Sequence, residues 1–431
     1  MDTQLTRARD GQITDEMRRV ARCEGVDETL VQGEIAAGRL IIPANVNHRS
    51  LEPIGIGMSL RCKVNANIGN SQLSSDLEGE VEKLDAAVGN GADAVMDLST
   101  GPRIDEIRRA IVERSTVPVG TVPIYEAAEG VGEIEELTPD ALFEVIERHG
   151  EQGVDFITVH CGLLASHLEL ALARTTGIVS RGGSLTARWM KRNGRENPLY
   201  AGFDRLLEIC RRYDMSLSLG DGLRPGCIAD ASDAAQFAEL EVLGELVRRS
   251  RDAGVQAMVE GPGHIPLGEV EMNIAKQIQI CDGAPFYVLG PIVTDIAAGH
   301  DHIASAIGGA VAATAGAAML CYVTPAEHLG LPDADEVRRG VIAHRIAAHA
   351  ADVARARPGA RQADYEMARA RYAMDWERQF ELMIDPKTAR EIWERSSEGC
   401  RDKGPEACSM CGPKFCAMRL SRELGEKERS S

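Results

Sequence analysis

Residues 216–264 read SLSLGDGLRPGCIADASDAAQFAELEVLGELVRRSRDAGVQAMVEGPGH, and this stretch decides the fold. Two short apolar runs, 216–220 and 256–259, lie on either side of the amphipathic segment 234–252. A strand, a helix and a second strand in this order predict two parallel strands joined by a crossover helix. The first run leads into Asp-Gly-Leu-Arg and the second into Glu-Gly-Pro-Gly-His, so chemically capable residues follow both predicted strands.

The same alternation extends along most of the chain. The predicted strands are the apolar runs 39–46, 61–68, 92–98, 117–124, 155–161, 216–220, 256–259, 286–289 and 317–323. Helix-like segments lie between many of them, including 76–87, 104–114, 141–149 and 234–252. Repeated strand–helix order predicts an α/β protein with a parallel sheet.

Polar residues at the strand ends favour a closed barrel over an open sheet. They are Asn67, Asp97, Tyr125, His160, Ser180–Arg181, Asp221–Arg224, Glu260–His264 and His328. In a barrel the carboxyl ends of all strands meet at one mouth, whereas an open sheet offers a single crevice where its strand order reverses. We therefore predict a TIM-type (β/α)8 barrel.

The chain divides into three predicted parts. Residues 1–39 form a helical segment, in which Gln-Ile-Thr-Asp-Glu at 12–16 resembles a capped helix start. Residues 40–356 form the barrel, with the substrate and metal sites. Residues 357–431 begin with a long amphipathic helix over 364–383, and continue through a polar linker to a cysteine cluster.

Composition narrows the function classes. The net charge of −18 and the lack of a long basic run argue against nucleic-acid binding. No apolar run is long enough to suggest a membrane span, and residues 303–323 are better explained as a buried helix and strand. The chain begins without the apolar core of a signal peptide, so its eleven cysteines suggest a reducing cytoplasm rather than a disulfide scaffold.

The sharpest local signal is CSMCGPKFC, which places Cys408, Cys411 and Cys416 within nine residues. Three thiolates can hold an iron–sulfur cluster and leave one iron open to a small molecule, since full protein ligation normally takes four cysteines. A zinc site needs a fourth ligand, and the nearest candidate is Cys400 across the polar linker. We favour the cluster over zinc and over buried thiols.

Two histidines follow predicted strands and form a candidate metal pair. Glu260 ends a strand, and the Gly-Pro-Gly turn after it leads to His264, while Thr-Pro-Ala-Glu leads to His328. A lone histidine is more often structural than a ligand, so the metal interpretation depends on both lying at the same mouth. Glu260 and Asp97 are the carboxylates best placed for proton transfer.

Two loops could supply positive charge for an anionic substrate. Ser180-Arg181-Gly182-Gly183 resembles an anion-binding loop with exposed amides, and Asp221-Gly-Leu-Arg224 sets a second guanidinium beside a carboxylate. For each loop a tight turn with a structural salt bridge is an equally good explanation. Together they provide the local cations that an acidic protein needs to bind a phosphate ester.

With these motifs in view, the chain resembles the phosphomethylpyrimidine synthase (ThiC) family, in its short form. The matching stretches are VNANIGN (64–70), VMDLSTG (95–101), GTVPIY (120–125), IVSRGG (178–183), SLGDGLRPG (218–226), EGPGH (260–264), APFYVLGP (284–291), CYVTPAEHL (321–329) and CSMCGPKFC (408–416). They cover most of the chain from about residue 42 onward, in order.

The resemblance implies a radical chemistry. A 4Fe-4S cluster on Cys408, Cys411 and Cys416 would cleave S-adenosylmethionine, and the 5′-deoxyadenosyl radical would rearrange 5-aminoimidazole ribotide. The product would be 4-amino-5-hydroxymethyl-2-methylpyrimidine phosphate, a thiamine precursor, with formate and carbon monoxide released. The family also implies a homodimer whose cluster segment reaches toward the partner's barrel, and an electron donor such as flavodoxin or ferredoxin.

The resemblance also implies a set of site residues. The family's substrate contacts fall on Asn67, Met96, Tyr125, His160, Ser180, Arg181, Gly182, Asp221, Gly222, Leu223, Arg224, Glu260 and Tyr287. Its second metal, usually zinc, falls on His264 and His328.

Two positions depart from the family pattern, and other functions remain open. Cys161 stands where many members have Ala, and His300 where they usually have Tyr. Either departure fits simple sequence drift, or the related branch that makes 5-hydroxybenzimidazole, a cobalamin lower-ligand precursor, from the same ribotide. A non-catalytic iron or zinc protein would explain the cysteines but not the strand-end loops. A metal-dependent barrel hydrolase or lyase would use His264 and His328 and leave the cysteines structural.

Overall fold

The computed structural model describes residues 2–397 and 410–429. It separates into two compact units, Met1–Arg355 and Ala356–Ser431.

The first unit is built on a closed parallel barrel. In the described part of the chain its eight strands are β3 (Lys63–Ile68), β4 (Ala94–Asp97), β5 (Val119–Thr121), β6 (Phe156–Val159), β7 (Ser216–Leu219), β8 (Ala257–Glu260), β9 (Phe286–Leu289) and β10 (Met319–Cys321). The barrel closes where Met319 pairs with Lys63 on one side and with Tyr287 on the other. The predicted (β/α)8 barrel is therefore confirmed.

One predicted strand, residues 39–46, does not belong to the barrel. Its first part forms β1 (Leu40–Ile41), which pairs antiparallel with β2 (Ile56–Gly57). Pro43 lacks an N–H group and limits extension of this pairing. The backbone N–H and C=O of Ile42 are instead bound by the side-chain amide of Gln256, at 2.8 and 3.0 Å. The run is apolar because it is buried. A segment can be buried in this way without being a strand of the barrel.

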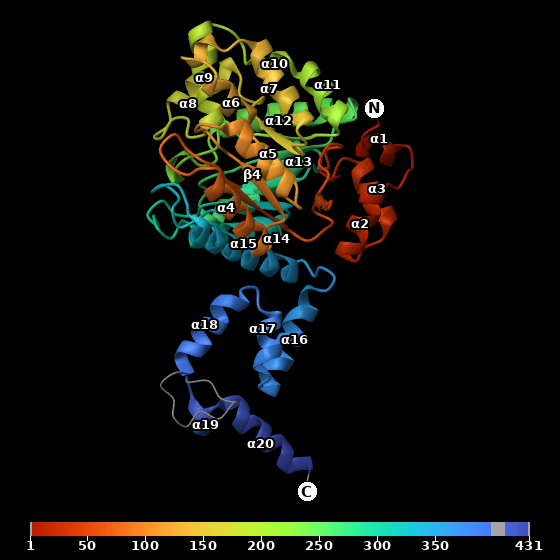
Figure 1. Ribbon diagram of the computed structural model, residues 1–431, viewed down its shortest axis with the longest axis vertical. Coiled ribbons are helices and arrows are strands. Elements are labelled where there is room, and N and C mark those ends of the chain that lie inside the picture. Colours follow the sequence, from red (N-terminus) through yellow and green to blue (C-terminus); the bar gives the residue numbers. More distant parts are fainter. Residues whose placement is uncertain (1, 398–409, 430–431) are drawn as a thin grey trace. The chain divides into compact units, whose positions relative to one another are not determined.

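Helices surround the barrel in the order expected for repeated βα units (Figure 1). They are α4 (Leu77–Gly89), α5 (Ile104–Arg114), α6 (Pro123–Glu129), α7 (Pro139–Glu151), α8 (Leu168–Leu172), α9 (Arg181–Asn193), α10 (Pro198–Ala201), α11 (Phe203–Tyr213), α12 (Ala234–Asp252), α13 (Val270–Ile280), α14 (Asp301–Ala315) and α15 (Ala334–Ala354). Short 3₁₀ turns lie at η1 (Ile134–Glu136), η2 (Ala165–His167), η3 (Ile228–Asp230) and η4 (Leu267–Glu269).

The helix α12 illustrates why these segments are helical. Asp233 caps its first turn, where the side chain accepts a hydrogen bond from the backbone N–H of Gln236. Leu240, Leu243 and Val247 recur at helical spacing and are buried against the barrel. Residues 303–323, predicted as a buried helix and strand, likewise form most of α14 and all of β10. Among the helices of the described residues, none is both long and apolar enough to cross a membrane.

Three helices precede the barrel and have a small core of their own. They are α1 (Gln4–Arg9), α2 (Asp15–Glu24) and α3 (Glu28–Ala36), drawn in red in Figure 1. Thr14 caps α2 by accepting from the N–H of Met17, as the capping pattern predicts. The hydroxyl of Thr3 donates to the carbonyl of Gly254 at 2.6 Å, which ties α1 to the end of α12.

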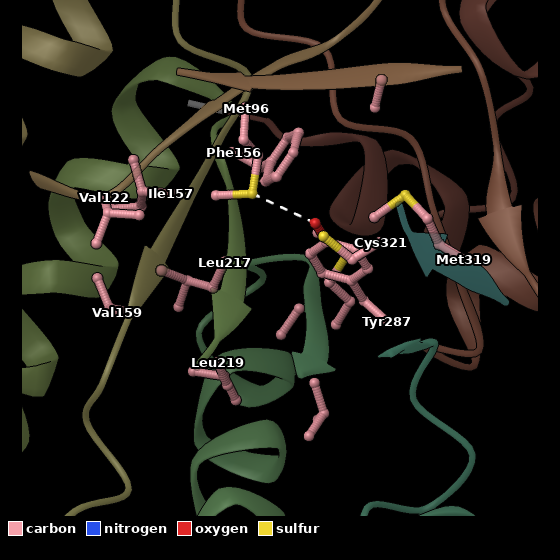
Figure 2. Close-up of a cluster of buried hydrophobic side chains, with 14 of the residues drawn as sticks. Met96, Val122, Phe156, Ile157, Val159, Leu217, Leu219, Tyr287, Met319 and Cys321 are labelled. Atoms are coloured by element: carbon pink, nitrogen blue, oxygen red, sulfur yellow. Dashed lines mark hydrogen bonds between the residues drawn. The ribbon is translucent and has the colours of Figure 1, made fainter. Parts of the chain in front are cut away.

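The barrel interior combines sulfur-containing and aromatic side chains with polar groups such as Asn65, Thr158 and Ser218. Figure 2 shows Met96, Phe156, Tyr287 and Cys321 close together in the barrel. Leu217 faces the surrounding helices instead, because its strand neighbour Ser218 points into the barrel. The hydroxyl of Tyr287 donates to the sulfur of Met96 at 3.5 Å across this interior (Figure 2). This packed layer forms the floor on which the polar mouth rests.

The second unit is helical. Its described helices are α16 (Ala360–Ala373), α17 (Trp376–Leu382), α18 (Pro386–Ser397), α19 (Gly412–Phe415) and α20 (Ala417–Arg429). The single long helix predicted over 364–383 is wrong, because Met374 adopts a left-handed conformation (φ 59°). Asp375 then caps α17 by accepting from the N–H of Arg378. The break lets Trp376 and Phe380 pack against Trp393 of α18, with ring centroids 5.6 and 5.9 Å away from it.

Candidate active site

A cavity opens at the carboxyl ends of the barrel strands. It is lined by Asn67, Met96, Leu98, Val122, Tyr125, Thr158, His160, Asp221, Arg224, Glu260, Gly261, Tyr287, Leu289 and Cys321. A second cavity shares part of this lining and adds Lys83, Arg181, Glu327 and His328. Residues that lie far apart in the sequence thus meet at one mouth, as the barrel requires.

Asp221 and Arg224 form a charged pair at the mouth with one unused acceptor. One guanidinium N–H of Arg224 donates to Oδ1 of Asp221 at 3.1 Å. The other oxygen of Asp221, Oδ2, is buried and has no hydrogen-bond partner in the protein. Burial raises the pKa of Asp221, and the charge of Arg224 opposes that rise. An unpaired buried acceptor is costly, so this oxygen is suited to a ligand N–H or O–H donor.

Glu260 is held by two hydroxyl groups inside the barrel. The hydroxyls of Thr158 and Ser218 both donate to Oε1 of Glu260, each at 2.6 Å. Burial, followed by the negative charge of Asp221, raises the pKa of Glu260 to about 7. A carboxyl group with this pKa can both accept and release a proton near neutral pH. Thr158 lies in no quoted motif, and Ser218 was quoted within a family motif but was not assigned to the site, because a hydroxyl within an apolar run resembles ordinary strand sequence.

His160 is buried and linked to the first turn of α9. Its Nε2 lies 3.1 Å from the hydroxyl of Ser180, which also caps α9 by accepting from the N–H of Gly183. Burial lowers the pKa of His160 to about 3, helped by the charge of Arg224, so the imidazole is neutral. An unprotonated Nε2 of the neutral ring can accept a hydrogen bond from the Ser180 hydroxyl group. A Cβ atom at Gly182 would lie 2.2 Å from the imidazole ring, so glycine is required for this close approach.

The predicted anion-binding loop is therefore the beginning of a helix, and most of its surface is covered. Ser180, Gly182 and Gly183 are buried, whereas Arg181 is exposed at the rim. The Arg181 guanidinium lies 5.0 Å above the ring of Tyr125. The expectation of exposed amides is wrong, because the first turn of α9 packs against His160 and the β7 loop. The positive end of a thirteen-residue helix still faces this region.

Gly222 and Leu223 lie beneath the surface of the mouth and do not line it. Both are buried, and neither is among the residues that line the two cavities at the mouth. The N–H of Leu223 donates to Oε2 of Glu239 at 2.7 Å. In the described structure this carboxyl belongs to α12, and sequence reasoning missed it because it lies on the inner face of an otherwise ordinary amphipathic helix.

On the wall of the cavity formed by β3, β9 and β10, polar side chains contact sulfur and hydroxyl groups. The amide of Asn65 donates to the hydroxyl of Tyr287 at 2.7 Å, and the amide of Asn67 donates to the sulfur of Cys321 at 3.0 Å. Figure 2 shows Tyr287 and Cys321 side by side in the barrel. Burial raises the pKa of Cys321 to about 12, so it remains a thiol. Cys321 was quoted within a family motif but was not recognised as a residue of the cavity.

Asp97 does not share this mouth. Its Oδ1 accepts from the N–H and the hydroxyl of Ser99, at 3.0 and 2.5 Å, and it does not line either cavity. Burial raises the pKa of Asp97 to about 6. Side chains alternate along a strand, so Met96 points into the barrel and Asp97 points out. The prediction that Asp97 is well placed for proton transfer is wrong, and its carboxylate instead shapes the loop after β4.

His264 and His328 lie together, with ring centroids 5.3 Å apart. Nδ1 of His264 is 2.7 Å from Asp295, and Nδ1 of His328 is 3.4 Å from Asp301. A carboxylate at Nδ1 fixes the tautomer and leaves Nε2 available for a metal, which is the usual support of a zinc-binding histidine. Within the described residues, no group of three or more His, Cys, Asp or Glu forms a complete metal site. The donor set fits a metal that completes its coordination with water or substrate.

The cysteine cluster lies in the second unit. Cys411 is exposed, Cys416 is half-buried, and both are free thiols on either side of α19. Cys408 and the alternative ligand Cys400 lie outside the described residues. Two free thiols at this spacing fit the cluster predicted from the motif.

Comparisons with known proteins assign the chain to a family. The model of the Radical SAM ThiC family matches residues 3–423. Phosphomethylpyrimidine synthases of Halobacterium salinarum (57% identical over 423 residues, 98% of this chain and 89% of the relative) and Natronomonas pharaonis (58% over 426 residues, 99% and 89%) are similar along almost the whole chain. A solved dihydropteroate synthase from Yersinia pestis aligns over 68% of this chain and 93% of its own, at TM-score 0.40 and 12% identity. The extent of the family match and of these identities places the chain in the radical SAM ThiC family.

Proposed function

We propose that this enzyme converts 5-aminoimidazole ribotide into 4-amino-5-hydroxymethyl-2-methylpyrimidine phosphate, with release of formate and carbon monoxide. The single observation that carries the proposal is the unpaired Oδ2 of Asp221, beside Arg224 and Glu260 in the mouth cavity. The curated relatives are named for phosphomethylpyrimidine synthesis, which supports this product over a benzimidazole.

The chemistry of the ribotide matches the residues at the mouth. Its exocyclic amine is a donor for Oδ2 of Asp221, which has no protein partner. Its phosphate is an anion for the exposed guanidinium of Arg181, near the positive end of α9. Glu260, with a pKa of about 7, would move protons to and from the ring as it rearranges. Neutral His160 would act as a hydrogen-bonding group rather than as a cation.

The cofactors of the family fit the residues that are present. Radical SAM membership implies S-adenosylmethionine and an iron–sulfur cluster, and Cys408, Cys411 and Cys416 would hold that cluster. When bound, the cluster would supply the electron that splits S-adenosylmethionine. His264 and His328 would hold zinc through Nε2, since Asp295 and Asp301 occupy Nδ1.

The remaining assignments complete the proposal. Gly182, Gly222 and Leu223 would act through backbone placement, because they are buried behind the cavity wall. Residues 1–39, 40–356 and 357–431 would serve as helical support, catalytic barrel and cluster segment. The enzyme would work in the cytoplasm as a homodimer and receive electrons from a low-potential donor such as flavodoxin or ferredoxin.

Anaerobic turnover tests the proposal. The reconstituted protein is incubated with the ribotide, S-adenosylmethionine and a reductant, and the products are identified by mass. We expect pyrimidine phosphate and 5′-deoxyadenosine from the native protein. The Asp221→Asn variant should bind the ribotide more weakly, by about 10–100-fold, because an amide cannot match a carboxylate as acceptor. A benzimidazole product, or full turnover in a Cys411→Ala variant, would overturn the proposal.

A further inference from the structure

Glu239 is a buried carboxyl group directly behind the loop that presents Asp221 and Arg224. It lies on the inner face of α12 and is 2% exposed. Its Oε2 accepts the N–H of Leu223 at 2.7 Å, whereas its Oε1 is buried and has no hydrogen-bond partner. Glu239, Asp221 and Glu260 together line a small cavity on the side of the loop that faces α12. The Glu239 carboxyl group thus contacts the Asp221–Arg224 loop from the side of α12.

Gly222 is tightly enclosed between two helices at this point. A Cβ atom at Gly222 would lie 3.0 Å from Oε1 of Glu239, and one at Gly183 would lie 2.4 Å from the carbonyl oxygen of Gly222. The loop is therefore packed between the carboxyl group of α12 and the first turn of α9. Any change in the length or charge of Glu239 must be transmitted to Gly222 and to its neighbour Asp221.

We propose that Glu239 is a positioning residue of the active site, which binds the Leu223 N–H and so holds the turn that presents Asp221 and Arg224 to substrate. The neutral acid retains an oxygen, Oε2, that accepts this N–H. Burial is the first cause that raises the pKa of Glu239, to about 8, and the negative charge of Asp221 contributes to the rise. The hydrogen bond from Leu223 opposes the rise.

The charged groups around Glu239 explain why ionisation would disturb the site. Asp221 and Arg224 face it from the β7 loop, and Glu260 faces the same small cavity from β8. Arg174 lies near enough to favour the charged form, but its guanidinium is already engaged with both oxygens of Asp233. A charge on Glu239 would therefore repel Asp221 and an anionic substrate and compete for Arg224. Affinity for the ribotide should fall as the pH rises through about 8.

The test compares two variants of nearly the same size. Glu239→Gln keeps a neutral acceptor for the Leu223 N–H, whereas Glu239→Leu removes it. Hydrogen–deuterium exchange of a peptide that contains residues 222 and 223 measures that hydrogen bond without ligand or turnover. Exchange should be unchanged in the Gln variant and about tenfold faster or more in the Leu variant, since the N–H loses its partner. Equal exchange in native protein and Leu variant would overturn the inference.

A second readout measures ribotide binding by calorimetry without S-adenosylmethionine. It rests on the proposed function, because it assumes that the ribotide is the substrate. At pH 7 the Gln variant should bind like the native protein, and the Leu variant about tenfold more weakly. Between pH 7 and 9 the native protein should lose affinity while the Gln variant loses less. A Leu variant that binds like the native protein would refute the positioning role, and a Gln variant that keeps the full alkaline loss of affinity would refute the role of the Glu239 proton. If the native protein fails to bind ribotide at all, the proposed function fails, while the exchange result still decides whether Glu239 holds the loop.

Discussion

Replacement of Gly183 by Ala tests how the first turn of α9 is packed against the β7 loop that carries Gly222. The added Cβ atom would lie 2.4 Å from the carbonyl oxygen and 2.7 Å from the Cα atom of Gly222. Both contacts are with backbone, so no flexible side chain can move away. An ordinary contact of about 3.4 Å requires the first turn of α9 and the β7 loop to separate by about 1 Å.

Two consequences follow from this separation. Overpacking of a buried contact typically lowers the free energy of unfolding by about 1–3 kcal/mol, which a thermal melt detects. A displacement of about 1 Å at groups that position substrate can lower kcat/KM by about 100-fold. We therefore expect kcat/KM for the ribotide to fall far more than stability alone explains, because Gly222 adjoins Asp221 in the chain.

Gly33→Ala is the matched control. Gly33 is also a helical glycine, in α3, but a Cβ atom there meets nothing within 4 Å. This variant should gain up to about 1 kcal/mol of stability from helix propensity and keep native kinetics. The reasoning fails if Gly183→Ala retains native kcat/KM, or if Gly33→Ala loses as much activity as Gly183→Ala.

Further predictions concern pH, metal binding and stability. Because the pKa of Glu260 is raised from 4.5 to about 7, the folded protein binds this proton more tightly than the unfolded chain. The contribution of Glu260 to stability therefore falls as pH rises from 4.5 to about 7. The melting temperature of the Glu260→Gln variant should depend less on pH over that window than that of the native protein. Parallel melting-temperature profiles of the two proteins would contradict this. Asp295→Asn should weaken zinc binding about 10–100-fold in a metal titration, because it no longer fixes the Nδ1 proton of His264; unchanged affinity would exclude this support. Arg108→Leu should cost about 3–5 kcal/mol by denaturant unfolding, because it leaves the largely buried Glu126 without one of its partners; a loss below about 1 kcal/mol would count against the buried pair.

The fold was largely predictable because a barrel strand carries a strong local signal. Eight of the nine apolar runs form the strands of the described barrel. The ninth, 39–46, has the same composition, but Gln256 binds the backbone of Ile42 in place of a neighbouring strand. The break at Met374 was also hidden, since amphipathic periodicity continues across it and the packing of Trp376 against Trp393 favours the turn.

The candidate site was predictable where residues form compact motifs. Asp221 and Arg224, or Ser180 and Gly182, stand close in sequence, and family resemblance names them. Thr158, Ser218 and Glu239 come from different strands or helices, so their meeting at Glu260 and Leu223 depends on three-dimensional packing. Asp97 shows the opposite error, in which a carboxylate at a strand end was expected to share the mouth but points away from it.

The amino-acid sequence by itself determined the alternation of strand and helix, the acidic surface and the three-cysteine motif, because periodicity, charge and spacing are properties of local sequence. Tertiary structure alone decided which groups keep an unpaired oxygen, which carboxyls retain a proton and which histidine nitrogen is free for a metal. These properties depend on burial and on partners more than a hundred residues away in some cases, such as Thr158 and Glu260. Local sequence carries no record of either.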